Sequence, residues 1–347
     1  MKVRQAREVA RQWMVEEASG LPGFCGAYSA GSTNWLADDT ELPGGSDLDI
    51  MVVLEGQQQS GTRGKLLYHE VVLEASYLSS DRLQSAERVL GDYHLAPSLR
   101  TTKVLVDRAG HLTEVLAAVT RDYAKRRWVR ERCANARNKV LQYCESLNQD
   151  GELHDRVMAS LFAAGITTHI LLAAGLRNPT VRSRYVAVRE LLTQYGHMEF
   201  HERLLELLGS ARLDRERAGR HLSALMEIFD AAKKAMRTPF PFATDISDIS
   251  RAMAIDASWE LIKRGCQREA MFWIGVTHSR CQKVLSKDAP EAVTASFRDH
   301  YQALLNDLGV PNSAAVRRRC DEIERFLPRV CGLADDIIRD NPEIEND

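Results

Sequence analysis

The stretch that decides the fold of this 347-residue chain is Ser46-Asp47-Leu48-Asp49-Ile50-Met51-Val52-Val53. Its apolar run is rich in β-branched residues, which predicts a buried strand. Side chains alternate between the two faces of a strand, so Asp47 and Asp49 share one face and the apolar residues beside them point to the other. Two carboxylates about 4 Å apart repel by roughly 4 kcal/mol at an effective dielectric constant near 20. Because a divalent cation removes this repulsion, the pair indicates a site for Mg²⁺, which prefers hard oxygen ligands.

The alternative is an ordinary strand with both aspartates on its solvent-exposed face. Aspartate is depleted in strands. Here two of them directly follow Gly44-Gly45-Ser46. This setting favours a binding role over a chance pair of exposed charges.

The order of a strand, Gly31-Ser32, a loop and then acid-hydrophobic-acid-hydrophobic resembles the nucleotidyltransferase superfamily. Within it, the antibiotic nucleotidyltransferases, such as the kanamycin and lincosamide enzymes, look most similar. The resemblance is at the level of motifs within residues 24–110, and beyond them only a helical C-terminal half is shared. It implies an enzyme that uses Mg²⁺ and transfers a nucleoside monophosphate, AMP from ATP, to a hydroxyl group of a small acceptor.

A third carboxylate is expected on a neighbouring strand. Residues 66–78 alternate as one strand would, which places Glu70 and Glu74 on the same face. Members of the superfamily end the site with an acid in a Leu-Glu-Val type of strand, and Leu73-Glu74-Ala75 matches that pattern best. The resemblance thus makes Glu74 the third metal ligand or the general base. Glu70 is the competitor, because some antibiotic enzymes carry a second glutamate there; a solubilising charge on an edge strand is its equal alternative.

The residues around the acidic pair suit a phosphate-binding role. Glycine at position 31 lets the backbone come close to a triphosphate, and Ser32 can offer an amide and a hydroxyl to a phosphate oxygen. Together with Ser46 they are the expected nucleotide-binding residues. Three acids of the following loop, Asp38, Asp39 and Glu41, have the turn-forming neighbours of a solvated loop and are not expected to be ligands.

The pattern along the chain predicts an α+β protein. A helix over 3–18 precedes a mixed sheet with strands near 24–30, 47–54, 66–78 and 103–108 and a helix near 81–90, and everything after His111 has helical periodicity. We therefore expect a nucleotidyltransferase domain over 1–111 and an all-helical domain over 112–347. Pro239-Phe240-Pro241-Phe242 offers a point of subdivision near 238–245.

A basic segment lies in the predicted helix 113–148. A solvated, charged helix face is the simplest explanation of this segment. In relatives, however, a lysine of the helical domain binds the triphosphate, so the resemblance implies the same role for Lys139 and Arg132.

Composition restricts the other possibilities. The formal net charge of −2 is not that of a nucleic-acid-binding domain. Seven cysteines without a Cys-x-x-Cys motif are typical of reduced thiols in a cytoplasmic protein, and the charged N-terminal segment is not a secretory signal. The apolar run Leu161–Leu176 is too short to span a bilayer, so it is expected to be a buried helix with His169 in the core and no membrane partner.

Two other functions stay open at this point. One keeps the chemistry but uses RNA or a protein side chain as the acceptor. The other is a catalytically silent binding module that retains the nucleotidyltransferase fold. The presence of all three acids disfavours the silent module, because a lapsed site is expected to lose at least one of its mutually repelling carboxylates.

Overall fold

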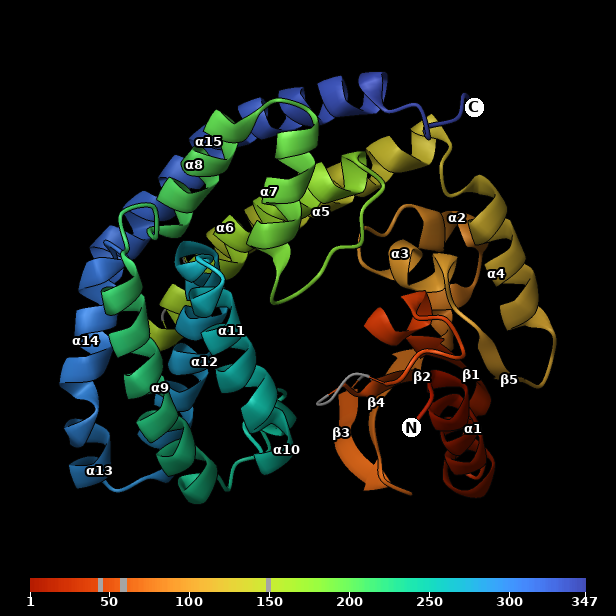
Figure 1. Ribbon diagram of the computed structural model, residues 1–347, viewed down its shortest axis with the longest axis horizontal. Coiled ribbons are helices and arrows are strands. Elements are labelled where there is room, and N and C mark those ends of the chain that lie inside the picture. The colour runs from red at the N-terminus through yellow and green to blue at the C-terminus, as the bar shows by residue number, and fades with distance from the viewer. Residues whose placement is uncertain (43–45, 57–60, 148–150) are drawn as a thin grey trace. The chain divides into compact units, whose positions relative to one another are not determined.

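The computed structural model describes residues 1–42, 46–56, 61–147 and 151–347. It is an α+β protein, as predicted: a five-stranded mixed sheet in the N-terminal half is followed by helices. Its contacts divide the chain into two compact units, Met1–Trp128 and Val129–Asp347, which we call the sheet unit and the helical unit (Figure 1).

The sheet unit alternates strands with short helices. Its strands are β1 (Phe24–Ala30), β2 (Leu48–Leu54), β3 (Gly61–Tyr68), β4 (Val71–Ser79) and β5 (Val104–Asp107). Its helices are α1 (Val3–Trp13), α2 (Ala86–Leu90), α3 (Leu95–Arg100) and α4 (His111–Asp122). A π-helical turn (Met14–Ala18) extends α1, and 3₁₀ turns cover Ser32–Trp35 and Ser80–Leu83.

The strand order is β3-β4-β2-β1-β5. Only β2 and β4 run parallel; the other neighbouring pairs are antiparallel. The parallel pair lies at the centre of the order, where β4 is covered on its other edge by β3 and β2 by β1. The two segments expected to carry the acids are therefore adjacent strands.

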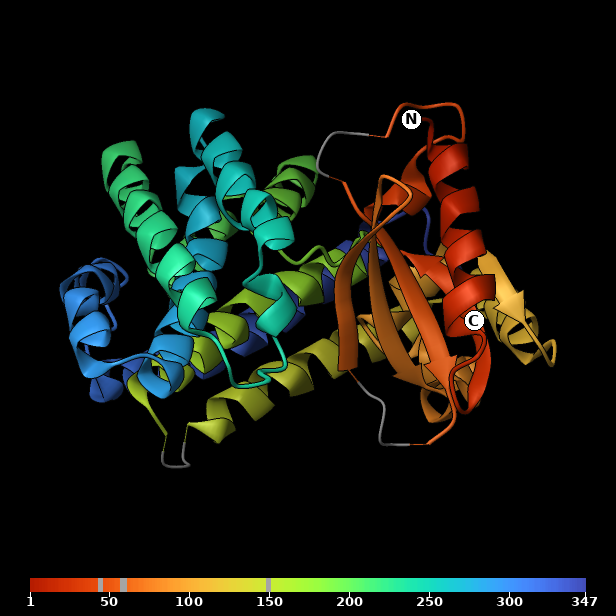
Figure 2. The same ribbon diagram turned by 90° about the horizontal axis from the view of Figure 1, so that it is seen from below.

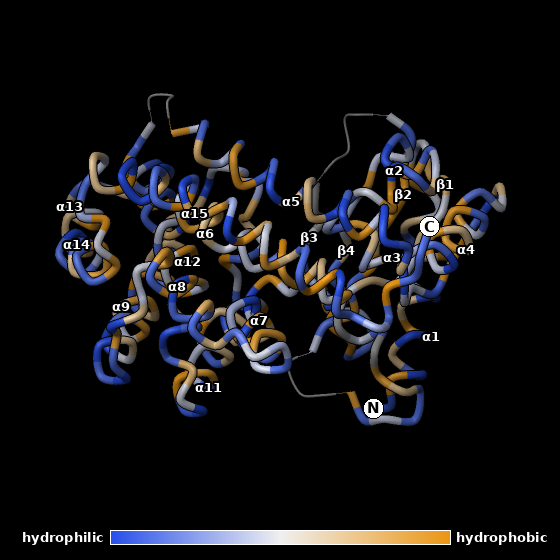
Figure 3. The backbone as a smooth tube through the Cα atoms, turned by 90° about the horizontal axis from the view of Figure 1, so that it is seen from above, coloured by the Kyte–Doolittle hydropathy of each residue, from blue (hydrophilic) through white to orange (hydrophobic). Residues whose placement is uncertain are grey.

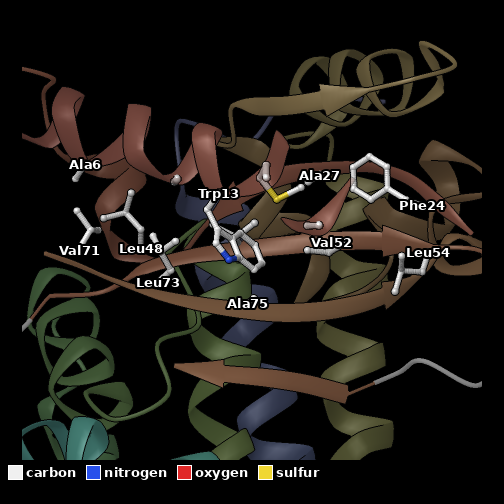
Figure 4. Packing of buried hydrophobic residues seen from close by; sticks show 14 residues of the cluster. Ala6, Trp13, Phe24, Ala27, Leu48, Val52, Leu54, Val71, Leu73 and Ala75 are labelled. Atoms are coloured by element: carbon white, nitrogen blue, oxygen red, sulfur yellow. The ribbon is translucent and has the colours of Figure 1, made fainter. Parts of the chain in front are cut away.

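One side of the sheet is covered by α1 (Figure 2). The helix buries residues at intervals of three to four, Val3, Ala6, Ala10 and Trp13, which is the spacing of one helical face. In Figure 4 this face packs against the apolar side of β2 and β4, including Leu48, Val52 and Leu73. The apolar side chains of β2 thus point into the core, and Asp49 lies on the opposite face of the strand.

The segment 66–78 is not one strand, and this part of the prediction is wrong. It contains the end of β3, a two-residue turn at His69-Glu70, and β4. Both turn residues have positive φ, 43° and 65°. Such a turn matches the right-handed twist of the two strands it joins, which makes a tight hairpin possible without glycine at either position.

The helical unit contains α5 (Arg126–Ser146), whose first residues belong to the sheet unit, and the helices that follow it. These are α6 (Leu153–Ala174), α7 (Arg184–Gln194), α8 (Met198–Leu208), α9 (Arg215–Ala235), α10 (Asp248–Arg251), α11 (Ala257–Lys263), α12 (Gln267–Asp288), α13 (Glu291–Ser296), α14 (Arg298–Asp307) and α15 (Ser313–Asp340). In the described part of the chain after His111, every regular element is helical, as predicted. Hydrophobic and hydrophilic residues alternate along most of these helices (Figure 3).

Helix α6 lies at the core of the helical unit, with α15 and α12 packed along it. By length and composition it could cross a membrane, but 83% of its most apolar window is buried inside the structure. The side chain of His169 is 2% exposed and its Nε2 lies 3.0 Å from the carbonyl oxygen of Thr180. The prediction of a buried helix with a core histidine is confirmed.

The domain limits differ from the expected ones. The division falls after Trp128 rather than after His111, because α4 packs against α2, α3 and β5 of the sheet unit. The helix expected over 113–148 is two helices, α4 and α5, separated at Tyr123–Lys125. No subdivision is seen near 238–245 in the described chain, since α9 before this segment packs on α12 after it.

Candidate active site

The acidic face of β2 lies beside the acidic face of β4. In the parallel register of the two strands, Asp49 is directly opposite Glu74. Leu48 and Ile50 are 3% and 1% exposed and face the core, whereas Asp49 is half-buried on the other face. Asp47 precedes the first residue of β2 and has the same parity as Asp49.

The carboxylates of Asp47, Asp49 and Glu74 converge. Each offers an oxygen atom that lies within 4.8 Å of those of the other two. Among the described residues, no other group of three or more potential metal-ligating side chains meets this limit. The predicted convergence is confirmed, and we call these three residues the acidic trio.

Gly31 directly follows β1, the strand that flanks β2 on its other edge. Its φ of 74° and ψ of −171° fall in a region that is essentially restricted to glycine. A β-carbon at this position would lie 1.6 Å from Oδ2 of Asp49. Gly31 is therefore needed to make room for the Asp49 carboxylate, and its backbone forms one wall of the site.

Lys65 on β3 is a member of the site that the sequence analysis missed. In the antiparallel register of the hairpin it lies opposite Glu74. Its ammonium group donates hydrogen bonds to Oδ2 of Asp47 and Oε2 of Glu74, and its side chain is only 6% exposed. The sequence signal for this pairing is weak: a two-residue turn at His69-Glu70 pairs residue 65 with residue 74, but the turn contains no glycine that would mark it.

Burial and Lys65 shift the pKa values of two acids of the trio, Asp47 and Glu74. For Asp47, burial favours the neutral form, but the hydrogen bond and charge of Lys65 outweigh it and lower the pKa of this carboxyl. For Glu74, burial raises the pKa, and the adjacent Asp47 carboxylate acts in the same direction. Burial opposes the charge of Lys65, yet its hydrogen bonds to the two acids raise its pKa. Lys65 thus favours the charged form of Asp47, whereas Glu74 keeps a raised pKa beside it.

Glu70 is not on the face of the trio. It occupies the second position of the hairpin turn, with φ of 65°, and is exposed. The expectation that it shares the strand face with Glu74 is wrong, because the chain reverses direction at this residue. Glu74 is left as the third acid.

The other residues expected to bind nucleotide differ in placement. Ser46 is half-buried next to Asp47. Ser32 begins a 3₁₀ turn directly after Gly31, and its side chain lies outside the described part of the structure. Arg7 of α1 holds this turn, since Nη2 donates to the carbonyl oxygens of Thr33 at 2.8 Å and Leu36 at 3.2 Å.

The loop acids are not part of the site, as predicted. Asp38 accepts hydrogen bonds from Arg7 and from Lys103, the latter at 3.2 Å. Asp39 lies 3.5 Å from Arg4, and Glu41 pairs with the N-terminal amine at 2.9 Å. These pairs attach the loop to α1, to the N-terminus and to Lys103 just before β5.

Lys139 and Arg132 belong to the helical unit. Lys139 is exposed, with Nζ 3.3 Å from Oε1 of Gln142 and 5.3 Å from the ring centroid of Tyr143. Arg132 is fully buried, unlike a cation on a solvated helix face. A nucleotide-binding role for these two residues stays a prediction.

The acidic trio suits a hard divalent cation. Mg²⁺ is bound in proteins by one or two carboxylates together with water and substrate phosphates. Three half-buried carboxylates within reach of one another provide protein ligands of this kind. The donor set contains no sulfur or imidazole, so it does not favour zinc.

A scan of this chain against models of protein families finds no match, and a search of curated proteins finds none.

Proposed function

We propose that this chain is a Mg²⁺-dependent nucleotidyltransferase, which transfers a nucleoside monophosphate from a nucleoside triphosphate to a hydroxyl group of a small acceptor. The observation that carries the proposal is the convergence of Asp47, Asp49 and Glu74 on adjacent strands. Gly31 supports it as well, because the lack of a side chain there leaves room for the Asp49 carboxylate beside the other two acids. The sequence motif favours ATP as the donor and an antibiotic-type acceptor.

The reaction makes one bond and breaks another at phosphorus. The acceptor oxygen bonds to the α-phosphorus, the bond from that phosphorus to its bridging oxygen breaks, and pyrophosphate leaves. Asp47 and Asp49 would hold the metal, which supplies neutralisation of charge on the phosphate oxygens. The hydroxyl proton must pass to a base.

Glu74 is the residue in this site best suited to take the proton. Burial raises the pKa of its carboxyl, and a base is most effective when its pKa approaches the working pH. Its oxygen atoms are also near enough to Asp49 to complete a second metal position. Both roles are compatible with its place in the trio.

The experiment is a search for acceptor-dependent pyrophosphate release. The full chain is incubated with ATP labelled at the α-phosphate, Mg²⁺ and pooled hydroxylated compounds, including aminoglycosides and lincosamides. We expect one pool to gain label and release an equal amount of pyrophosphate. If no small-molecule pool gains label but RNA or a protein does, the acceptor is a macromolecule. A strong loss of activity with added salt would then point to RNA.

The second candidate is a catalytically silent module with the same fold. Lys65 favours it, because an ammonium group between two carboxylates can compensate their charge without a metal. Nucleotide titration with and without Mg²⁺ separates the two. Binding that requires Mg²⁺ supports the enzyme, whereas metal-independent binding, or none, supports the silent module.

A further inference from the structure

Both the strand register and the hydrogen bonds of its ammonium group hold Lys65 in the site. The His69-Glu70 turn sets the register that places it opposite Glu74, and its ammonium group donates hydrogen bonds to Asp47 as well as to Glu74. Its side chain is 6% exposed, so its stem is packed and its charge is largely removed from water. A buried charge needs partners of opposite sign, and here the partners are two of the three expected metal ligands.

The charge of Lys65 has opposite effects on a free metal ion and on a metal–polyphosphate complex. A bare divalent cation at the trio is repelled by the ammonium group and competes with it for the same oxygen atoms. A polyphosphate brings negative oxygens that lysine binds well, so the ammonium group can exchange a carboxylate for a phosphate. The Lys65 side chain therefore weakens binding of a bare cation and strengthens binding of a metal–polyphosphate complex.

We propose that Lys65 is the resident counter-cation of the acidic trio and that it makes the site bind a divalent cation together with a nucleoside triphosphate in preference to the cation alone. The second half of this inference, the preference for a cation together with a nucleoside triphosphate, rests on the proposed function. Its first half, charge compensation in the metal-free protein, stands on the hydrogen bonds of Lys65 alone. Without nucleotide, Lys65 acts on the carboxylates, and with nucleotide bound its ammonium group contacts the phosphates.

The test measures coupling between metal and nucleotide in the full chain. Mn²⁺ binding is titrated alone and in the presence of an α,β-methylene analogue of ATP, for the natural protein and for Lys65→Met. We expect the natural protein to bind Mn²⁺ much more tightly with the analogue. In Lys65→Met, free Mn²⁺ should bind at least about tenfold tighter, and the gain from the analogue should shrink by a similar factor.

A second measurement does not depend on nucleotide. In EDTA, Lys65→Met should melt at a lower temperature than the natural protein, because Asp47 and Glu74 then lose the ammonium group that both of them bind. Mn²⁺ should restore more stability to this variant than to the natural protein. Lys125→Met is the matched control, since Lys125 pairs with the largely buried Asp122 at 2.8 Å in the same unit.

The outcomes separate this inference from the proposed function. Unchanged Mn²⁺ affinity and an unchanged melting temperature in EDTA for Lys65→Met would overturn the counter-cation role. If the natural protein binds neither Mn²⁺ nor the analogue, the proposed function fails, and the EDTA melting experiment still decides the first half. If Lys65→Met does not fold, Lys65→Arg and Lys65→Gln replace it: the first should keep the coupling and the second should reduce it.

Discussion

The carboxylate of Asp49 occupies the space where a side chain at position 31 would begin. A β-carbon on Gly31 would lie 1.6 Å from Oδ2 of Asp49 and 2.6 Å from its Cγ. Asp49 is on β2 and Gly31 directly follows β1, whose last residue, Ala30, pairs with Asp49 in the antiparallel register. Asp49 can therefore keep the present orientation of its carboxylate only because residue 31 has no side chain.

We expect Gly31→Ala to disable the site and to destabilise the sheet unit. The alanine would adopt a backbone conformation that costs about 1–3 kcal/mol for a residue other than glycine, and the Asp49 carboxylate would also have to move. Thermal melting and Mn²⁺ titration measure the two effects.

The control for this variant is Gly110→Ala. Gly110 also has positive φ, 78°, but an added β-carbon would meet nothing within 4 Å. It should lose stability without losing Mn²⁺ binding. Equal Mn²⁺ affinity in Gly31→Ala and the natural protein would show that Asp49 is not a ligand in its present position.

Asp49→Asn should reduce nucleotidyl transfer by roughly 100-fold or more, since it removes a charged ligand at the point where phosphate charge must be neutralised. The side-chain volume hardly changes, so the melting temperature in EDTA should not fall. Pyrophosphate release and melting are the measurements. Asp38→Asn, an exposed loop acid, is the control and should keep full activity; retained activity in Asp49→Asn would reject the assignment of the trio.

Glu74→Gln and Glu70→Gln form a matched pair on one hairpin. The first removes an acid of the trio, and we expect a loss of transfer comparable to that of Asp49→Asn. The second changes an exposed turn residue, and activity should stay within about twofold of the natural protein, as is usual for surface positions. A greater loss in Glu70→Gln than in Glu74→Gln would return the role to Glu70.

A buried histidine in the helical unit should make stability depend on pH. His278 on α12 is fully buried, and neither ring nitrogen has a hydrogen-bond partner among the described residues. Burial lowers its pKa to about 3, and the nearby His221 and His300 act in the same direction. The folded protein therefore disfavours the charged form, whereas the unfolded chain takes up the proton near pH 6.5.

The contribution of His278 to stability is full above pH 6.5 and decreases as the pH falls toward 3. At pH 5 the loss is about 2 kcal/mol, from 1.5 pH units at 1.36 kcal/mol each. Denaturant unfolding at pH 7.5 and 5.0 measures it. In His278→Leu the difference between the two pH values should be smaller by about this amount, and in the half-exposed control His197→Gln it should not change. An equal pH dependence in the leucine variant and the natural protein would contradict the prediction.

Local patterns in the sequence determined which faces of the strands carry acids. The alternation around Asp47 and Asp49 has a period of two, and period is a property of neighbouring residues that needs no knowledge of the rest of the fold. The same holds for the helical periodicity after His111 and for the buried face of α1. The face of Glu74 follows from the same alternation, and the Leu73-Glu74-Ala75 pattern marks it as the third acid.

The tertiary structure alone decided what surrounds those acids. Lys65 reaches Asp47 and Glu74 only because the chain turns at His69-Glu70, and that turn has neither of the glycines that usually signal it. The register between strands depends on turn geometry and on pairing across the sheet, which a one-dimensional pattern does not contain. For the same reason the collision between a side chain at position 31 and Asp49 is visible only when β1 and β2 lie side by side.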